Sequence, residues 1–104
     1  MTASDFDRRA TDELKALDQA LGELPELDVD SNGEVLSAEL PGGSTLVINS
    51  HRAAGQIWLS AEMKAAHYTH DPATNCWRDD KTGEDLHARL SAVLTRTLGR
   101  AVTL

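Results

Sequence analysis

The stretch at residues 45–61, TLVINSHRAAGQIWLSA, determines the fold that we expect for this chain. It contains two apolar runs with strand character, joined by a short polar connection that includes Gly55. Successive side chains of an extended strand point to opposite faces of a sheet. One face of this hairpin therefore collects the aliphatic residues, which we interpret as core: Leu46, Ile48, Ile57 and Leu59.

The opposite face of the same hairpin carries Val47, Asn49, Gln56 and Trp58. A large aromatic and an aliphatic side chain beside two amides are unexpected on the side of an antiparallel sheet that faces water. Tryptophan is enriched where one protein surface is buried against another. The pattern therefore favours a partner surface on this face, with partial burial of Trp58 at a sheet edge as the plain alternative.

Amphipathic helices are predicted on both sides of a run of short strands. Apolar residues recur every three or four positions over residues 4–24, which predicts a helix capped by Ser4 and ending near Gly22 to Pro25. A second helix is predicted to open at residues 82–85, with Thr82 as its cap and Asp85 as its box partner, and to end at Gly99. Alternation predicts strands in LDVD, EVLSAEL, STLVIN, QIWLSA, HYTHD and CWR, with EMKAA as a connection.

This order of elements predicts an α+β fold in a single domain of residues 1–104. We expect a two-layer sandwich in which two helices pack on one face of an antiparallel sheet of five to seven strands, in α-β-α order. A chain of 104 residues is long enough to fold without a metal or a disulfide. The face that carries Asn49, Gln56 and Trp58 is left uncovered.

Acidic side chains are concentrated at the start of the chain. Residues 1–40 hold 11 of the 17 acidic side chains but only 3 of the 10 basic ones. Such a field repels nucleic acid and anionic membranes, and it attracts cations or a basic protein surface. Carboxylate oxygens suit hard cations, so a weak cation site is one interpretation and a solvated helix face is the other.

Several kinds of enzyme site have no support in the sequence. It has no phosphate-binding glycine loop, GxSxG, HExxH, EF-hand loop or paired CxxC. His67 and His70 are three apart in a predicted strand, so they should point to opposite faces and not chelate one metal together. The single cysteine, Cys76, favours a reducing compartment, and we expect a cytoplasmic protein. No apolar run approaches the roughly 18 residues needed to span a bilayer, so we expect no membrane anchor.

Five segments taken together resemble the frataxin family in its bacterial CyaY form: NGEVLSAELPGGSTLVIN, QIWLS, HY, CW and DDKTGEDLHARL. The resemblance covers nearly the whole chain, and the segments stand in the right order with short spacings. It implies an α-β sandwich with an acidic ridge on the first helix and first strand. It also implies weak binding of Fe²⁺ or Fe³⁺ on that ridge, and a role in iron–sulfur cluster assembly through contact with the cysteine desulfurase and its scaffold protein.

The resemblance assigns residues to both surfaces. The acidic ridge corresponds to seven carboxylates: Asp7, Asp12, Asp18, Glu23, Glu26, Asp28 and Asp30. The partner face corresponds to Asn49, Gln56 and Trp58, with His67 where eukaryotic members place a basic Arg. Gly22 and Pro25 stand where bacterial relatives are expected to carry carboxylates.

We therefore expect an accessory protein that binds iron and regulates cluster assembly, is not itself an enzyme, and exists as a monomer. Other divalent cations should share the ridge, and oligomerisation with iron stays open. One alternative is an iron-oxidising and iron-storing protein that acts as an oligomer, although the helices lack the Glu-x-x-His arrangement of di-iron sites. The other is a pure protein-interaction module of the assembly machinery whose acidic face never meets metal.

Overall fold

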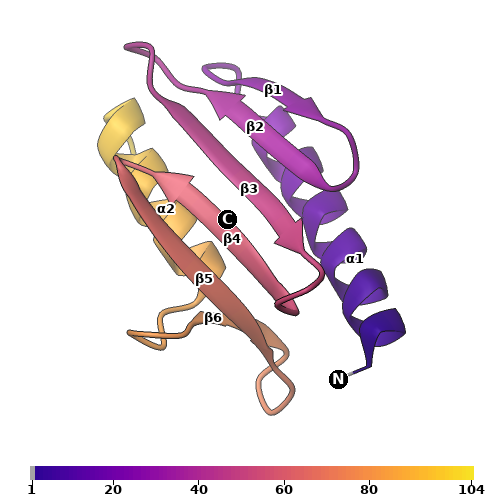
Figure 1. Ribbon diagram of the computed structural model, residues 1–104. Helices are drawn as coiled ribbons and strands as arrows, with labels where there is room; N and C mark the ends of the chain where they lie inside the picture. Colours follow the sequence, from indigo (N-terminus) through magenta and orange to yellow (C-terminus); the bar gives the residue numbers. More distant parts are fainter. Residues whose placement is uncertain (1) are drawn as a thin grey trace.

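The computed structural model describes residues 2–104, which form two helices and six strands. Helix α1 (Ala3–Gly22) comes first and α2 (Leu86–Leu98) last. The strands between them are β1 (Asp28–Ser31), β2 (Val35–Glu39), β3 (Thr45–His51), β4 (Gln56–Ala61), β5 (Lys64–Asp71) and β6 (Cys76–Asp79). Each strand pairs antiparallel with its neighbour in sequence, and both helices lie on one side of the sheet (Figure 1). The predicted two-layer α+β sandwich is confirmed.

The hydrophobic core lies between the two helices and one face of the sheet. α1 contributes residues spaced by three or four, as predicted: Phe6, Ala10, Leu14, Leu17 and Leu21. The sheet contributes the aliphatic face that the central hairpin predicted, in which Ile48 pairs with Leu59 across β3 and β4. α2 adds Leu86, Leu90, Val93 and Leu94. Within residues 2–104 no helix has both the length and the hydropathy to cross a bilayer.

The turn between β4 and β5 is shorter than the sequence predicted. It consists of Glu62 and Met63, whose φ angles are 53° and 64°, and β5 begins at Lys64. The interpretation of EMKAA as a connection is therefore wrong. Two positive φ angles define the hairpin turn that normally selects Asn and Gly, and this turn has neither. Glu62 is instead held from α2, because Arg96 Nε donates to its carboxylate at 2.9 Å.

Both predicted helix caps are also wrong, by two or three positions. The Thr2 hydroxyl, not Ser4, caps α1 by accepting the N–H of Asp5 at 3.1 Å. The Asp85 carboxylate caps α2 by accepting the N–H of Ala88 at 3.1 Å, whereas Thr82 lies in the preceding turn. The predicted end of α2 is confirmed, since Gly99 adopts a left-handed φ of 69° there.

Candidate functional site

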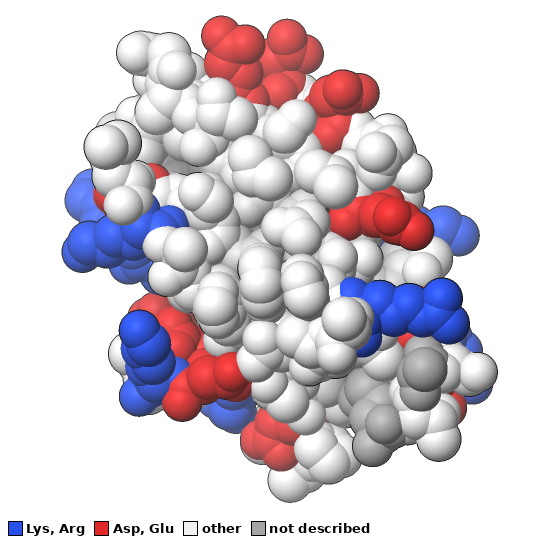
Figure 2. All heavy atoms as spheres, viewed as in Figure 1, with Lys and Arg blue, Asp and Glu red and all other residues white. Residues whose placement is uncertain are grey.

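The sheet face turned away from the helices is uncharged at its centre. Figure 2 shows this face as a broad area without Lys, Arg, Asp or Glu, with charged side chains around the rim. Strand pairing places Asn49, Trp58 and His67 in one row across β3, β4 and β5. The parallel row begins with Asp30 at the β1 edge and continues through Ser37, Val47, Ser60 and Ala65. Gln56 lies on the same face, two residues before Trp58, so the structure brings the four predicted partner residues together.

Trp58 lies between two histidine rings. The His67 ring stacks on the indole with centroids 4.4 Å apart and planes 19° apart. The His51 ring stacks at 3.9 Å and 11°. Because β4 lies between β3 and β5, the two imidazoles flank opposite faces of the indole. Sequence reasoning missed His51; the signal was the hairpin register, which pairs it with Gln56 and so sets it diagonal to Trp58.

Hydrogen bonds fix the polar edge of the indole. Trp58 Nε1 donates to Gln56 Oε1 at 2.9 Å, and the amide nitrogen of Gln56 donates in turn to the carboxylate of Asp80. The other oxygen of Asp80 accepts from Thr69 Oγ1 at 2.7 Å. The backbone N–H of Asp80 donates to the carbonyl of His67 at 2.9 Å. The indole is thus tied to the connection that leaves β6, in which Asp80 is a residue that the sequence did not single out.

The predicted iron ligands of α1 lie on two sides of the helix. Asp7 lines a hollow of about 340 Å³ beside the β1–β2 and β3–β4 connections, together with Glu34. Asp18 follows three helical turns later on the same side. Asp12 lines a different hollow, toward β6. A single ion therefore cannot contact Asp12 and Asp7 at once, and the predicted ridge is divided along α1.

Arginines already bind two of the predicted ligands. Arg52 Nη2 lies 3.1 Å from Asp7 Oδ2. Arg100 donates to both oxygens of Glu26, at 2.7 and 2.9 Å, and these hydrogen bonds lower the pKa of Glu26 to about 2. A cation would have to compete with these arginines. Glu23, by contrast, is the exposed C-cap residue of α1.

The β1–β2 hairpin places two carboxylates opposite each other. Asp28 pairs directly with Glu39 across the two strands, and Asp30 follows on the same face of β1. Like charges in directly opposed positions repel each other, which a bound cation would relieve. Sequence reasoning missed Glu39, because only the register of the hairpin pairs it with Asp28. Among the described residues, no three His, Cys, Asp or Glu side chains converge on one point as metal ligands. The carboxylates form a dispersed and shallow surface.

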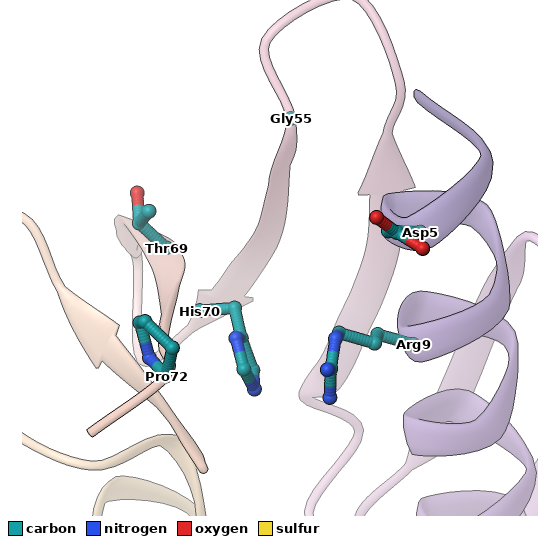
Figure 3. A pocket seen from close by; sticks show the side chains of 6 residues that line it. All are labelled: Asp5, Arg9, Gly55, Thr69, His70 and Pro72. Carbon is teal, nitrogen blue, oxygen red and sulfur yellow. The ribbon is translucent and has the colours of Figure 1, made fainter. Parts of the chain in front are cut away.

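A separate hollow of about 310 Å³ lies between the start of α1 and the end of β5. Figure 3 shows Arg9 of α1 and His70 of β5 on either side of this hollow, with Asp5 one turn before Arg9. His70 is only 8% exposed, and its Nε2 lies 2.9 Å from Asn75 Oδ1. His67 is exposed on the other face of β5, which confirms that the two histidines cannot share a metal.

Comparisons with known proteins agree with this architecture. A family model described as a frataxin-like domain matches residues 1–100. The iron–sulfur cluster assembly protein CyaY of Thioalkalivibrio sulfidiphilus is 34% identical over 102 residues, 95% of each chain. That of Dechloromonas aromatica is 32% identical, over 100% of this chain and 99% of its own.

Two solved structures share the fold. Frataxin from Psychromonas ingrahamii matches with a TM-score of 0.88 and 26% identity, over 99% of this chain and 97% of its own. Trimeric frataxin from the yeast Saccharomyces cerevisiae matches with a TM-score of 0.76 and 26% identity, over 88% of this chain and 80% of its own. The likeness therefore extends over nearly the whole of the chain.

Proposed function

Because this chain belongs to the frataxin-like family, we propose that it is an accessory protein of iron–sulfur cluster assembly, acting in the cytoplasm. It docks on the cysteine desulfurase and its scaffold protein through the outer face of the sheet. The observation that carries this proposal is the uncharged row of Asn49, Trp58 and His67, with the indole held between two rings. The relatives named as iron–sulfur cluster assembly proteins support the process.

Trp58 is the anchor of this docking surface. Its indole is half-buried and oriented before any partner arrives, by His51, His67 and the hydrogen bond to Gln56. Binding therefore orders little that is not already ordered, which lowers the entropic cost of association. Aromatic anchors surrounded by small uncharged residues commonly supply most of the binding energy at protein interfaces.

Iron is held weakly, as cargo, on the acidic surface of α1 and β1. The dispersed carboxylates offer an ion few protein ligands and leave most of its shell to water, so Fe²⁺ can leave readily. The facing pair Asp28 and Glu39 supports this part of the proposal, since their repulsion favours a cation nearby. Mn²⁺ and Co²⁺ compete for the same oxygens, because such sites select little among divalent ions.

The two surfaces can be separated by substitution. Trp58→Ala is expected to weaken binding to the assembled desulfurase and scaffold complex about thirtyfold, since an anchor of this kind carries roughly 2 kcal/mol. The same variant should bind Fe²⁺ like the wild type. Asp28→Asn combined with Glu39→Gln should weaken Fe²⁺ binding and leave docking unchanged. Fe²⁺ titrated anaerobically should broaden NMR signals of α1 and of the β1–β2 hairpin alone. Dissociation constants for the complex and for Fe²⁺ give both readouts.

Two controls accompany this experiment. Met63→Ala removes a fully exposed apolar side chain from the tip of the β4–β5 turn, outside the docking row, and should leave docking unchanged. Glu84→Gln removes one exposed negative charge far from β1 and should leave Fe²⁺ binding unchanged. A natively melting Trp58→Ala variant that docks like the wild type would refute the partner surface. If Fe²⁺ broadens no NMR signals, the protein is a pure interaction module that does not bind iron.

Iron storage by an oligomer is the second candidate function, and one comparison favours it, namely the trimeric state of the yeast frataxin structure. Sedimentation of this chain with and without excess iron under air tests it. Assembly that appears only with iron supports storage, and a monomer under both conditions excludes it.

A further inference from the structure

Two titratable side chains occupy the otherwise uncharged centre of the docking surface. They are His51 and His67, which stack on the two faces of Trp58. Histidine is the side chain that ordinarily changes charge between pH 5 and 8. Acidification would therefore place as many as two positive charges at the centre of a face whose charged groups otherwise lie at the rim (Figure 2).

The hydrogen bond that His51 makes requires its neutral form. Its Nδ1 accepts the backbone N–H of Ala54 at 3.2 Å, so the ring proton must reside on Nε2. A second proton on Nδ1 would set one N–H against another and remove this contact. The carbonyl of His51 also accepts the Ala54 N–H, at 3.2 Å. Protonation would thus loosen the β3–β4 connection without abolishing its turn.

The charged groups near His51 are few. Arg52 follows it in the chain and is paired with Asp7 of α1 at 3.1 Å. Glu34, from the β1–β2 connection, lines the same hollow as His51. β4 places only uncharged side chains against the ring, Gln56 directly opposite and Trp58 on the diagonal.

Two acidic side chains and one basic side chain lie around His67. Asp79, Asp80 and Lys81, at and beyond the end of β6, line a small hollow with it. The carboxylate of Asp80 already accepts hydrogen bonds from Gln56 and Thr69. On the other side, β4 contributes the neutral indole of Trp58. Glu34 and Asp79 are therefore the carboxylates able to stabilise a charged ring, and each of the two hollows also holds a basic side chain, Arg52 or Lys81.

We propose that docking requires the neutral forms of His51 and His67, so that a fall in pH releases the partner. This inference rests on the proposed docking function and specifies the regulation of the same surface. Two observations indicate that acidification weakens docking and does not strengthen it. The His51 contact with Ala54 exists only in the neutral ring. The net charge of −7 also selects a basic partner surface, which would repel imidazolium groups.

The test measures the dissociation constant for the assembled desulfurase and scaffold complex at pH 5.5, 6.5 and 7.5. The wild type is compared with the double variant His51→Gln, His67→Gln, which cannot titrate at either position. Because titration of the partner affects both proteins equally, the readout is the ratio of their dissociation constants. Each linked proton can weaken binding about tenfold per pH unit below its titration. Between pH 7.5 and 5.5, the dissociation constant of the wild type should therefore rise at least about tenfold more than that of the double variant.

A constant ratio, or one that moves in favour of the wild type at low pH, overturns the proposed regulation. Failure of both proteins to bind at every pH would instead refute the docking function, and the regulation with it. His87→Gln is the matched control, because it removes an imidazole from the helical side of the molecule and should track the wild type. In the free protein, the Trp58 indole N–H signal should titrate in the wild type and stay fixed in the double variant. An indole signal that does not titrate also contradicts the proposal.

Discussion

At the scale of single residues, neighbours in β4 serve the fold and the surface separately. Ile57 is fully buried and Trp58 lies on the outer face, half-buried. Ile57→Ala should lower the free energy of unfolding by about 2–5 kcal/mol, because it leaves a cavity in the core. Trp58→Ala should cost less than half as much as Ile57→Ala. Urea denaturation of both variants measures this difference, and equal losses would mean that the indole belongs to the core.

The same scale shows what strand alternation can and cannot predict. Alternation alone places Asn49, Gln56 and Trp58 on one face, because the period of two is local to each strand. It cannot identify His51 or Glu39 as members of a cluster, since their neighbours come from other strands. Those neighbours depend on the register of two hairpins, which the turn geometry decides.

At the scale of elements, the two helices are joined by an ion pair. His87 Nε2 of α2 lies 2.5 Å from Glu13 Oε1 of α1. The hydrogen bond to Glu13 raises the pKa of His87 above its ordinary value, against the opposing effect of burial. A raised folded-state pKa means that this pair stabilises the fold fully below the ordinary histidine pKa, near 6.5. The stabilisation is then lost as pH rises through the higher folded-state value.

Glu13→Gln should therefore destabilise the protein more at pH 6 than at pH 9. The measurement is the difference in melting temperature between wild type and variant across that range. Other titrating groups act on both proteins and cancel in this difference. A difference that stays constant, or grows with pH, would show that the helices gain nothing from the charged form of His87.

Elements as a whole were more predictable than their ends. The helices and the core face followed from apolar spacing, which repeats along each element. The caps did not, because Thr2 and Ser4 are equally good candidates in sequence, and so are Thr82 and Asp85. The sequence predicts a connection at residues 64–66, since Lys and Ala carry little β propensity. They are strand because β4 pairs with them, as Ala61 does with Lys64.

At the scale of the whole molecule, repulsion between acidic side chains destabilises the folded state. With 11 acidic and 3 basic side chains in residues 1–40, repulsion there should outweigh ion pairs such as that of Arg100 with Glu26. Raising ionic strength from low salt to about 0.15 M should therefore raise the melting temperature. Mn²⁺ should raise it further by binding the native state. Calorimetry checks both, and a melting temperature that falls with salt would show that the ion pairs dominate.

The two-residue length of the turn at Glu62 and Met63 determines which side chains the molecule presents to others. Side chains alternate along β5, with His67 outward and Tyr68 fully buried. One added residue in this turn, if β5 then paired one position out of step, would exchange these faces. Tyr68 would replace His67 beside Trp58, and an imidazole would enter the core. The length of the β4–β5 turn thus determines which side chains form the docking surface, although the turn itself lies outside that surface.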